Sequence, residues 1–238
     1  MSFSDTELGL IKSAPLLGEV PAHVVNAAVA AQLGEQLLLP PDTVFLKAGQ
    51  RQTGLWVIAH GTIETFIVDA AGREKILDFA AIGGTLGEET LFGDRPLQYT
   101  ARSLTQAAVL QLPETLVAEW MERYPPFARR LTALIAERID YLGRDVLTFC
   151  TKKATARLVC YLVCHFNQTP ASPDGTHSLH LAIPRNKLAS RLSISDSHLS
   201  RAFRELEEAS LIVRQGRGYF IPDVAALSQY VCPAGCDF

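Results

Sequence analysis

Long apolar runs are absent from this chain of 238 residues, and no cysteine occurs before Cys150. No stretch reaches the roughly 20 apolar residues that a membrane-spanning helix needs. The N-terminal segment is polar and acidic and lacks the basic start of a secretory signal peptide. The five cysteines, an odd number gathered after residue 149, do not suit a secreted disulfide framework. We therefore expect a cytoplasmic protein without a membrane partner.

Catalytic spacings are lacking as well. The chain shows no Ser-His-Asp arrangement, no phosphate-binding glycine loop and no metal-hydrolase spacing. Neither Cys160 nor Cys232 has an identifiable base partner that would make it a nucleophile. These absences argue against the common enzyme classes and favour a binding protein.

Charge is present but unevenly placed. Residues 1–120 carry 7 Lys+Arg against 14 Asp+Glu, whereas residues 121–238 carry 15 against 11. The net charge of −3 is thus the sum of an acidic N-terminal half and a basic C-terminal half, which is typical of a nucleic-acid module joined to another domain. We expect a sensor domain over residues 1–112, a connecting helix over 113–150 and a DNA-binding domain over 151–238.

The segment from Ile183 to Leu206 has the pattern of a helix-turn-helix. Apolar residues recur at helical spacing on both sides of an interruption at residues 193–195, and Ser195 is a good N-cap for the second helix. A short, polar and cationic face suits entry into the major groove of double-stranded DNA. An ordinary helical hairpin with a solvated face is the alternative. The outward positions of the second helix are Ser197, His198, Ser200, Arg201 and Arg204.

Two β-like runs follow this segment, at residues 211–214 and 219–221. The residues between them contain glycine, which predicts a hairpin turn with Arg217 at its tip. Such a hairpin is the wing of a winged helix-turn-helix, and its tip contacts the phosphate backbone without reading sequence.

The N-terminal half has mostly the pattern of β-strands. Short β-branched or aromatic runs at 43–46, 55–58, 62–68, 75–79 and 108–112 are separated by glycine-bearing turns, which predicts a small antiparallel roll. The turn glycines are Gly49, Gly54, Gly61, Gly72, Gly83 and Gly84. In such a roll Gly87 and Glu88 would give a small-molecule pocket its free amides and a carboxylate. The alternative is that Glu88 caps the short helix that follows.

A long helical pattern begins at Pro125 and continues for about six turns. Its apolar residues repeat at heptad spacing, as in a two-stranded coiled coil. The stripe is longer than a small roll can cover, so we expect a homodimer whose paired recognition helices read a palindromic operator. A helix packed only on its own domain is the alternative. The seam residues are Ile135, Ile139, Leu142, Val146 and Phe149.

The order of these parts resembles the CRP/FNR family of bacterial transcription regulators, from about Leu37 to Leu227. The resemblance implies an α+β protein with a cyclic-nucleotide-binding-like β-roll, a dimerisation helix and a winged helix-turn-helix, and RNA polymerase as a partner. Its motifs are Gly61-Thr62-Ile63, Gly72-Arg73-Glu74, Gly83, Gly87-Glu88, Ile139, Leu199-Ser200-Arg201, Gly216-Arg217 and Asp223.

The resemblance also bears on the ligand. In cyclic-AMP-responsive members a pocket glutamate, here Glu88, holds the ribose and an Arg-Ser pair neutralises the phosphate. Those two positions fall on Leu97 and Gln98, and an apolar side chain cannot offset the burial of an anion. Arg95 or Arg102 would substitute only after loop rearrangement. We therefore expect a branch responding to redox state, oxygen or nitric oxide; a cyclic-nucleotide-responsive regulator and a regulatory subunit acting on a protein are the alternatives.

Cysteines and histidines give further cofactor candidates. The oxygen-sensing branch holds an iron-sulfur cluster through N-terminal cysteines, which this chain lacks, but two later pairs of thiols could hold zinc or a cluster. We expect the sulfurs of the first pair, one helical turn apart, to face the surface or the tail. Cysteines also pack as small apolar residues, which is the alternative. Haem, known in relatives of the nitric-oxide branch, would use His23 or His60 unless these are surface residues. The four thiols are Cys160, Cys164, Cys232 and Cys236.

The family's recognition helix usually carries Glu-x-x-Ser-Arg, whose polar residues meet bases. Ser200 and Arg201 match this motif, and Arg201 is the best candidate for a bidentate contact to guanine. Ser197, preceded by Asp196, stands at the glutamate position. Because serine reaches less far, we predict an altered preference at the base pair that glutamate would read.

Overall fold

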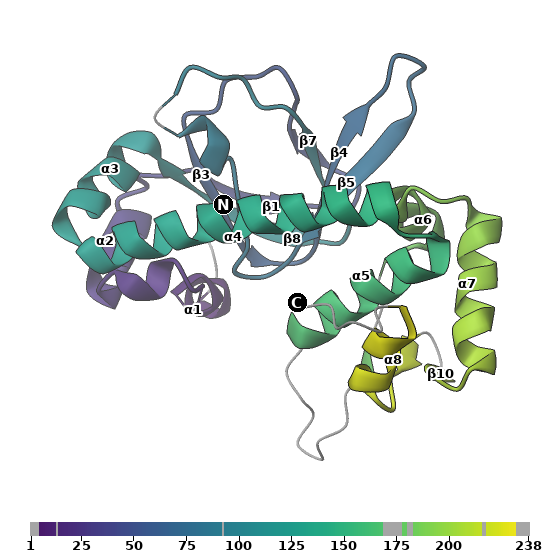
Figure 1. The fold of residues 1–238 in the computed structure, drawn as a ribbon. Coiled ribbons are helices and arrows are strands. Elements are labelled where there is room, and N and C mark those ends of the chain that lie inside the picture. Colours follow the sequence, from purple (N-terminus) through teal and green to yellow (C-terminus); the bar gives the residue numbers. More distant parts are fainter. Residues whose placement is uncertain are drawn as a thin grey trace. The chain divides into compact units, whose positions relative to one another are not determined.

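The computed structural model describes residues 5–12, 14–91, 93–168, 178–179, 183–215 and 218–231. The chain divides into two compact units, Met1–Asp140 and Tyr141–Phe238 (Figure 1). The boundary falls inside one continuous helix, α4 (Pro125–Thr151). None of the helices in these ranges is long and apolar enough to cross a membrane.

The first unit contains two four-stranded antiparallel sheets. One has the order β1 (Gln36–Leu39), β8 (Ala107–Pro113), β3 (Gly54–His60) and β6 (Thr85–Leu86). The other has the order β2 (Val44–Leu46), β7 (Thr100–Ser103), β4 (Ile63–Val68) and β5 (Glu74–Ala80). The predicted antiparallel roll is thereby confirmed.

The central strand β3 is covered on both faces. Trp56 and Ile58 join the core between the sheets, whereas Leu55 and Val57 pack in a second core with the helices. A strand buried on both sides reads as a continuous apolar run, which is what the sequence shows here. The helices of this unit are α1 (Asp5–Lys12), η1 (Leu17–Glu19), α2 (Ala22–Ala30), η2 (Glu88–Thr90) and α3 (Glu114–Arg123).

Two sequence expectations about this unit need correction. Gly54 does not lie in a turn but begins β3, paired with β8, and the position requires glycine because a Cβ there would come within 2.4 Å of the carbonyl oxygen of Leu112. The segment 113–150 contains two helices, α3 and α4, and not one. Tyr124 interrupts them with φ −125° and ψ 84°, since the residue before a proline is pushed out of the helical region.

The second unit contains α5 (Ala154–Gln168), α6 (Arg185–Leu192), α7 (Asp196–Glu208) and α8 (Val224–Val231). A three-stranded antiparallel sheet has the order β10 (Val213–Gln215), β11 (Gly218–Phe220) and β9 (Ser178–Leu179). Helix α5 packs against α7 and α8, and residues from all four helices share one hydrophobic core. Phe203 of α7 stacks on Tyr219 of β11, which fixes the helix to the sheet.

Candidate nucleic-acid interface

Helix α7 begins where the sequence predicts. Ser195 is its N-cap, and the Ser195 hydroxyl oxygen accepts a 3.3 Å hydrogen bond from the backbone N–H of His198. Two residues earlier Ser193 adopts a left-handed conformation, φ 55°, and its N–H bonds the carbonyl of Ser190 at the end of α6. The predicted sequence of helix, tight turn and helix is confirmed.

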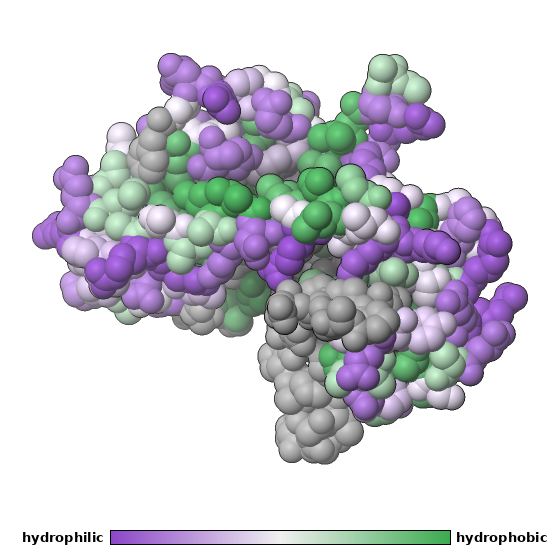
Figure 2. Space-filling model, in the orientation of Figure 1, coloured by the Kyte–Doolittle hydropathy of each residue, from purple (hydrophilic) through white to green (hydrophobic). Residues whose placement is uncertain are grey.

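The two faces of α7 differ sharply in chemistry. Leu199, Ala202, Phe203 and Leu206 are buried in the core of the second unit. The opposite face is polar and cationic, and hydrophilic atoms cover α7 at the right of Figure 2. A single exposed helix of this kind has the dimensions and donors needed in the major groove. The residues predicted to contact DNA, all exposed, are Ser197, His198, Ser200, Arg201 and Arg204.

The wing is present as a short hairpin. Strands β10 and β11 pair antiparallel with Gln215 opposite Gly218. They lie closer to the turn than the predicted runs at 211–214 and 219–221. Arg214 is exposed on β10. The hairpin tip, Gly216 and Arg217, lies outside the described residues, so the phosphate contact of Arg217 stays a prediction.

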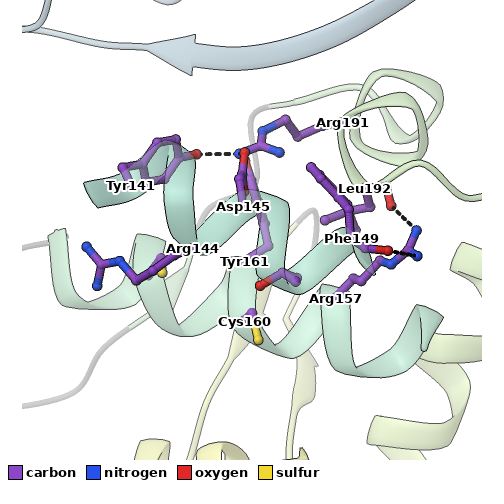
Figure 3. Close-up of a pocket in the computed structure, with 11 residues that line it drawn as sticks. Tyr141, Arg144, Asp145, Phe149, Arg157, Cys160, Tyr161, Arg191 and Leu192 are labelled. Atoms are coloured by element: carbon purple, nitrogen blue, oxygen red, sulfur yellow. Dashed lines mark hydrogen bonds and ion pairs between the residues drawn. The ribbon is translucent and has the colours of Figure 1, made fainter. Parts of the chain in front are cut away.

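Arg157 on α5 bonds the ends of α4 and α6, as Figure 3 shows. Its guanidinium donates to the carbonyl oxygens of Phe149 at 2.8 Å, Lys152 at 3.0 Å and Leu192 at 3.2 Å. Phe149 and Leu192 lie in the last turns of α4 and α6, where carbonyls have no partner within their own helix. Arg157 therefore satisfies the ends of both helices and holds the end of α4 to the helix-turn-helix.

A second arginine strengthens this junction. Arg191 of α6 is buried, forms a 2.7 Å ion pair with Asp145 of α4 and donates to the hydroxyl of Tyr141. Its guanidinium also lies 5.7 Å from the ring centroid of Phe149. A buried guanidinium requires such partners because its desolvation is costly. Phe149, predicted on the dimer seam, is thus half-buried between α4 and two arginines of its own unit.

The other seam residues lie on the surface of α4. Their exposed fractions run from 37% for Ile135 to 65% for Ile139. Figure 2 shows hydrophobic atoms along this helix. The row has the heptad spacing of a coiled-coil seam on a 27-residue helix, and its role as a dimer surface stays a prediction. The four exposed residues are Ile135, Ile139, Leu142 and Val146.

The glycine-acidic segment of the β-roll is internally bonded. Gly87, φ 92°, precedes η2, and its N–H donates to the hydroxyl oxygen of Tyr99 at 3.1 Å. The expectation of a free amide at this position is therefore wrong. Thr85 donates its hydroxyl to the carboxylate of Glu88, which is the first residue of η2. Burial raises the pKa of Tyr99, and the charges of Glu89 and Glu88 raise it further. Tyr99 is a partner of this segment that the sequence did not single out.

The positions where a cyclic phosphate would be neutralised hold no cation. Leu97 is fully buried in the core between the two sheets. Gln98 is exposed, and its side-chain amide donates to the carbonyl oxygen of Pro96 at 2.8 Å. Leu97 therefore contributes to folding of the roll, and its environment is apolar.

The two substitute arginines are placed elsewhere. Arg95 is exposed. Arg102 lies opposite buried Glu64 on β4 and bonds both Glu64, at 2.7 Å, and Glu74, at 2.6 Å. Hydrogen bonding to Glu74 raises the pKa of Arg102. The guanidinium of Arg102 is thus already paired with two carboxylates of its own sheet.

One contact of the first unit links α4 to the roll. Arg138 of α4 forms an ion pair with Asp78, a buried residue of β5. The hydroxyl of Thr65 donates to the backbone carbonyl of Asp78 at 3.4 Å. The local signal for this contact is an aspartate between apolar residues of a predicted strand, which does not reveal its partner.

The cofactor candidates are dispersed. Cys160 is buried and accepts a 3.1 Å hydrogen bond from the ammonium group of Lys152, so its sulfur does not face the solvent; the other expected position, toward the tail, involves residues outside those described. The cause is that α5 buries this turn beside α4, where Cys160 and half-buried Cys164 line a cavity of about 40 Å³ with Arg157 and Arg191 (Figure 3). Burial raises the pKa of Cys164.

The remaining cofactor candidates lie apart from these thiols. Cys232 and Cys236 lie outside the described residues. Among the residues that are described, no group of three or more His, Cys, Asp or Glu side chains could hold a metal ion. His23 is exposed on α2, and His60 is half-buried at the end of β3. The metal and haem sites therefore stay predictions.

Comparison with known proteins agrees with this architecture. A family model of the cyclic nucleotide-binding domain matches residues 36–124, and one of the Crp-like helix-turn-helix domain matches residues 156–230. The HTH-type transcriptional regulator Cmr of Mycobacterium tuberculosis is 23% identical over 82% of this chain and 75% of its own. The fumarate and nitrate reduction regulatory protein of Vibrio cholerae is 23% identical over 77% and 73%.

Solved structures share the fold. The structure of FixK2 from Bradyrhizobium japonicum superposes with a TM-score of 0.70 at 16% identity, covering 82% of this chain and 95% of that one. The fold, the exposed face of α7 and these relatives define a DNA-binding transcription regulator, and not an enzyme. The chain belongs to the CRP/FNR family.

Proposed function

We propose that the protein acts as a homodimer and places two α7 helices in successive major grooves of a palindromic operator. The observation that carries this proposal is the exposed polar and cationic face of α7, backed by the buried residues that fix the helix in place. The apolar row of α4 supports the homodimer, because two copies of the row would cover each other. RNA polymerase is the protein partner, and the cytoplasm is the location, since both DNA and polymerase are found there.

The DNA contact of Arg201 is tested by Arg201→Ala. We expect specific affinity to fall about 10- to 100-fold, because a bidentate contact to guanine is lost, while a salt-sensitive nonspecific component persists. Footprinting on a selected operator measures the first effect, and retention on DNA at low salt measures the second. Arg95→Ala removes the same charge from an exposed residue of the other unit and should leave both unchanged. Failure of the wild-type protein to bind DNA even at low salt would favour a subunit acting on a protein.

The signal, in this proposal, is not a cyclic nucleotide. Fully buried Leu97 and the commitment of Arg102 to Glu64 and Glu74 support it, because neither leaves a cation for a phosphate. The signal acts instead through a non-nucleotide ligand of the β-roll or through the cysteines.

Calorimetric titration with cyclic AMP tests the ligand class. We expect no binding heat up to about 1 mM ligand, which corresponds to a binding free energy weaker than about 4 kcal/mol. Operator affinity should likewise be the same with and without cyclic AMP. Micromolar binding, or an operator affinity that depends on cyclic AMP, would contradict a non-nucleotide signal.

A further inference from the structure

The first two turns of α7 contain one acidic residue, at the N-terminal end of the helix. Asp196 is the first residue of the helix and is exposed. Within the described ranges no hydrogen bond or ion pair holds its carboxylate. The neighbouring outward residues are serine, histidine or arginine. A carboxylate in this place is repelled by the phosphates and weakens DNA binding unless it meets a donor in the groove.

The hydroxyl next to Asp196 is already engaged. Ser197 and Ser195 share a hydrogen bond of 2.9 Å between their hydroxyl oxygens. The same Ser195 oxygen accepts from the backbone of His198 and lies 3.0 Å from the His198 ring nitrogen Nδ1. The Ser197 hydroxyl and the Nδ1 atom of His198 are thus both in contact with the N-cap, whereas the carboxylate of Asp196 is an acceptor that these contacts do not use.

The major groove offers a carboxylate few partners. Cytosine presents its N4 amino group as a donor, whereas guanine and thymine present acceptor oxygens that repel a carboxylate. Adenine also has an amino group, but its N7 acceptor lies beside it. Aspartate is therefore matched to cytosine.

We propose, on the basis of the DNA-binding function proposed above, that Asp196 is a specificity-determining residue. Its carboxylate accepts a hydrogen bond from the N4 amino group of a cytosine at one position of each half-site. The phosphate repulsion lowers affinity for every sequence, and the cytosine contact restores affinity for the cognate one. Asp196 thereby discriminates between operators, while the arginines of α7 bind all of them.

Asp196 also has a structural role, because an acidic residue in the first turn stabilises a helix. That role is independent of the bases in the groove. Base preference is consequently the readout that separates the two roles.

The experiment selects operators from a palindromic DNA pool with randomised half-sites, using the wild type, Asp196→Asn and Asp196→Ala. We expect the wild type to prefer cytosine at one half-site position by about 10- to 100-fold. Asn pairs with the N6 and N7 atoms of adenine, so Asp196→Asn should change that preference to adenine. Asp196→Ala should bind the four bases there equally.

Glu208→Gln is the matched control, since it removes one negative charge from an exposed residue at the other end of α7. It should raise affinity slightly for all sequences and keep the cytosine preference. Asp196→Asn nearly preserves shape, and its folding is checked by circular dichroism. An unchanged cytosine preference in Asp196→Asn overturns the assignment of Asp196 alone. A wild type without any base preference overturns the DNA-binding proposal together with it.

Discussion

Replacing Ile139 by aspartate is expected to convert the protein to a monomer and to lower operator affinity by more than about 100-fold. Ile139 is the most exposed apolar residue of the α4 row, at 65% of its surface. In a dimer it would lie in the seam, where a carboxylate without a partner is strongly disfavoured. A monomer holds one α7 helix and loses the advantage of binding two half-sites at once. Analytical ultracentrifugation and gel-shift titration measure the two effects.

Leu147 provides the matched control for this prediction. It is exposed to 63%, lies on the same helix and falls outside the heptad row. Leu147→Asp should therefore remain dimeric and bind the operator. A protein that stays dimeric after Ile139→Asp, or dissociates only after Leu147→Asp, would show that the row is not the dimer surface.

Replacing Arg157 by alanine is expected to destabilise the second unit by about 3 kcal/mol or more, because charge-assisted hydrogen bonds to at least three carbonyls are lost together. The carbonyls of Phe149 and Leu192, at the ends of two helices, would lose their side-chain donor. Urea unfolding, followed separately for the two units, measures the effect as a lower midpoint for the second unit alone.

Two further variants sharpen this test. Arg157→Lys keeps the charge but cannot span several carbonyls with one planar group, so it should be only slightly more stable than the alanine variant. Arg204→Ala removes an exposed arginine of the same unit and should lower DNA affinity without changing stability. An unfolding midpoint of Arg157→Ala equal to that of the wild type would contradict the role of Arg157.

Local chemistry explains which parts of the fold could be predicted. The helix-turn-helix followed from helical periodicity and from the N-cap Ser195, and strands such as β3 and β4 followed from runs of apolar and β-branched residues. Strand β7 was missed because its residues are polar, and it is held by the pairing of Arg102 with Glu64 across the sheet. Such a partner is distant in sequence and leaves no local signal.

The same distinction between local sequence signals and distant partners applies to the candidate site. The exposed face of α7 repeats every helical turn, so its residues could be named from the sequence. The contacts of Arg157, Arg191 and Arg138 join elements far apart in the chain, and periodicity does not pair them. The inward position of Cys160 also depends on tertiary packing, because its local pattern allowed either side of α5.

The division of α4 between the two units has a mechanical consequence. Its residues from Tyr141 onward, including Asp145 and Phe149, are fastened to the helix-turn-helix by arginines, while Arg138 is fastened to the roll. Arg138 and Tyr141, the nearest residues that these contacts hold, are three residues apart on the same helix. We expect torsion and bending of this helix to transmit the signal. Gly143 lies between Tyr141 and Asp145, where a Cβ would meet no atom within 4 Å, and its low helix propensity makes α4 easier to bend at this point.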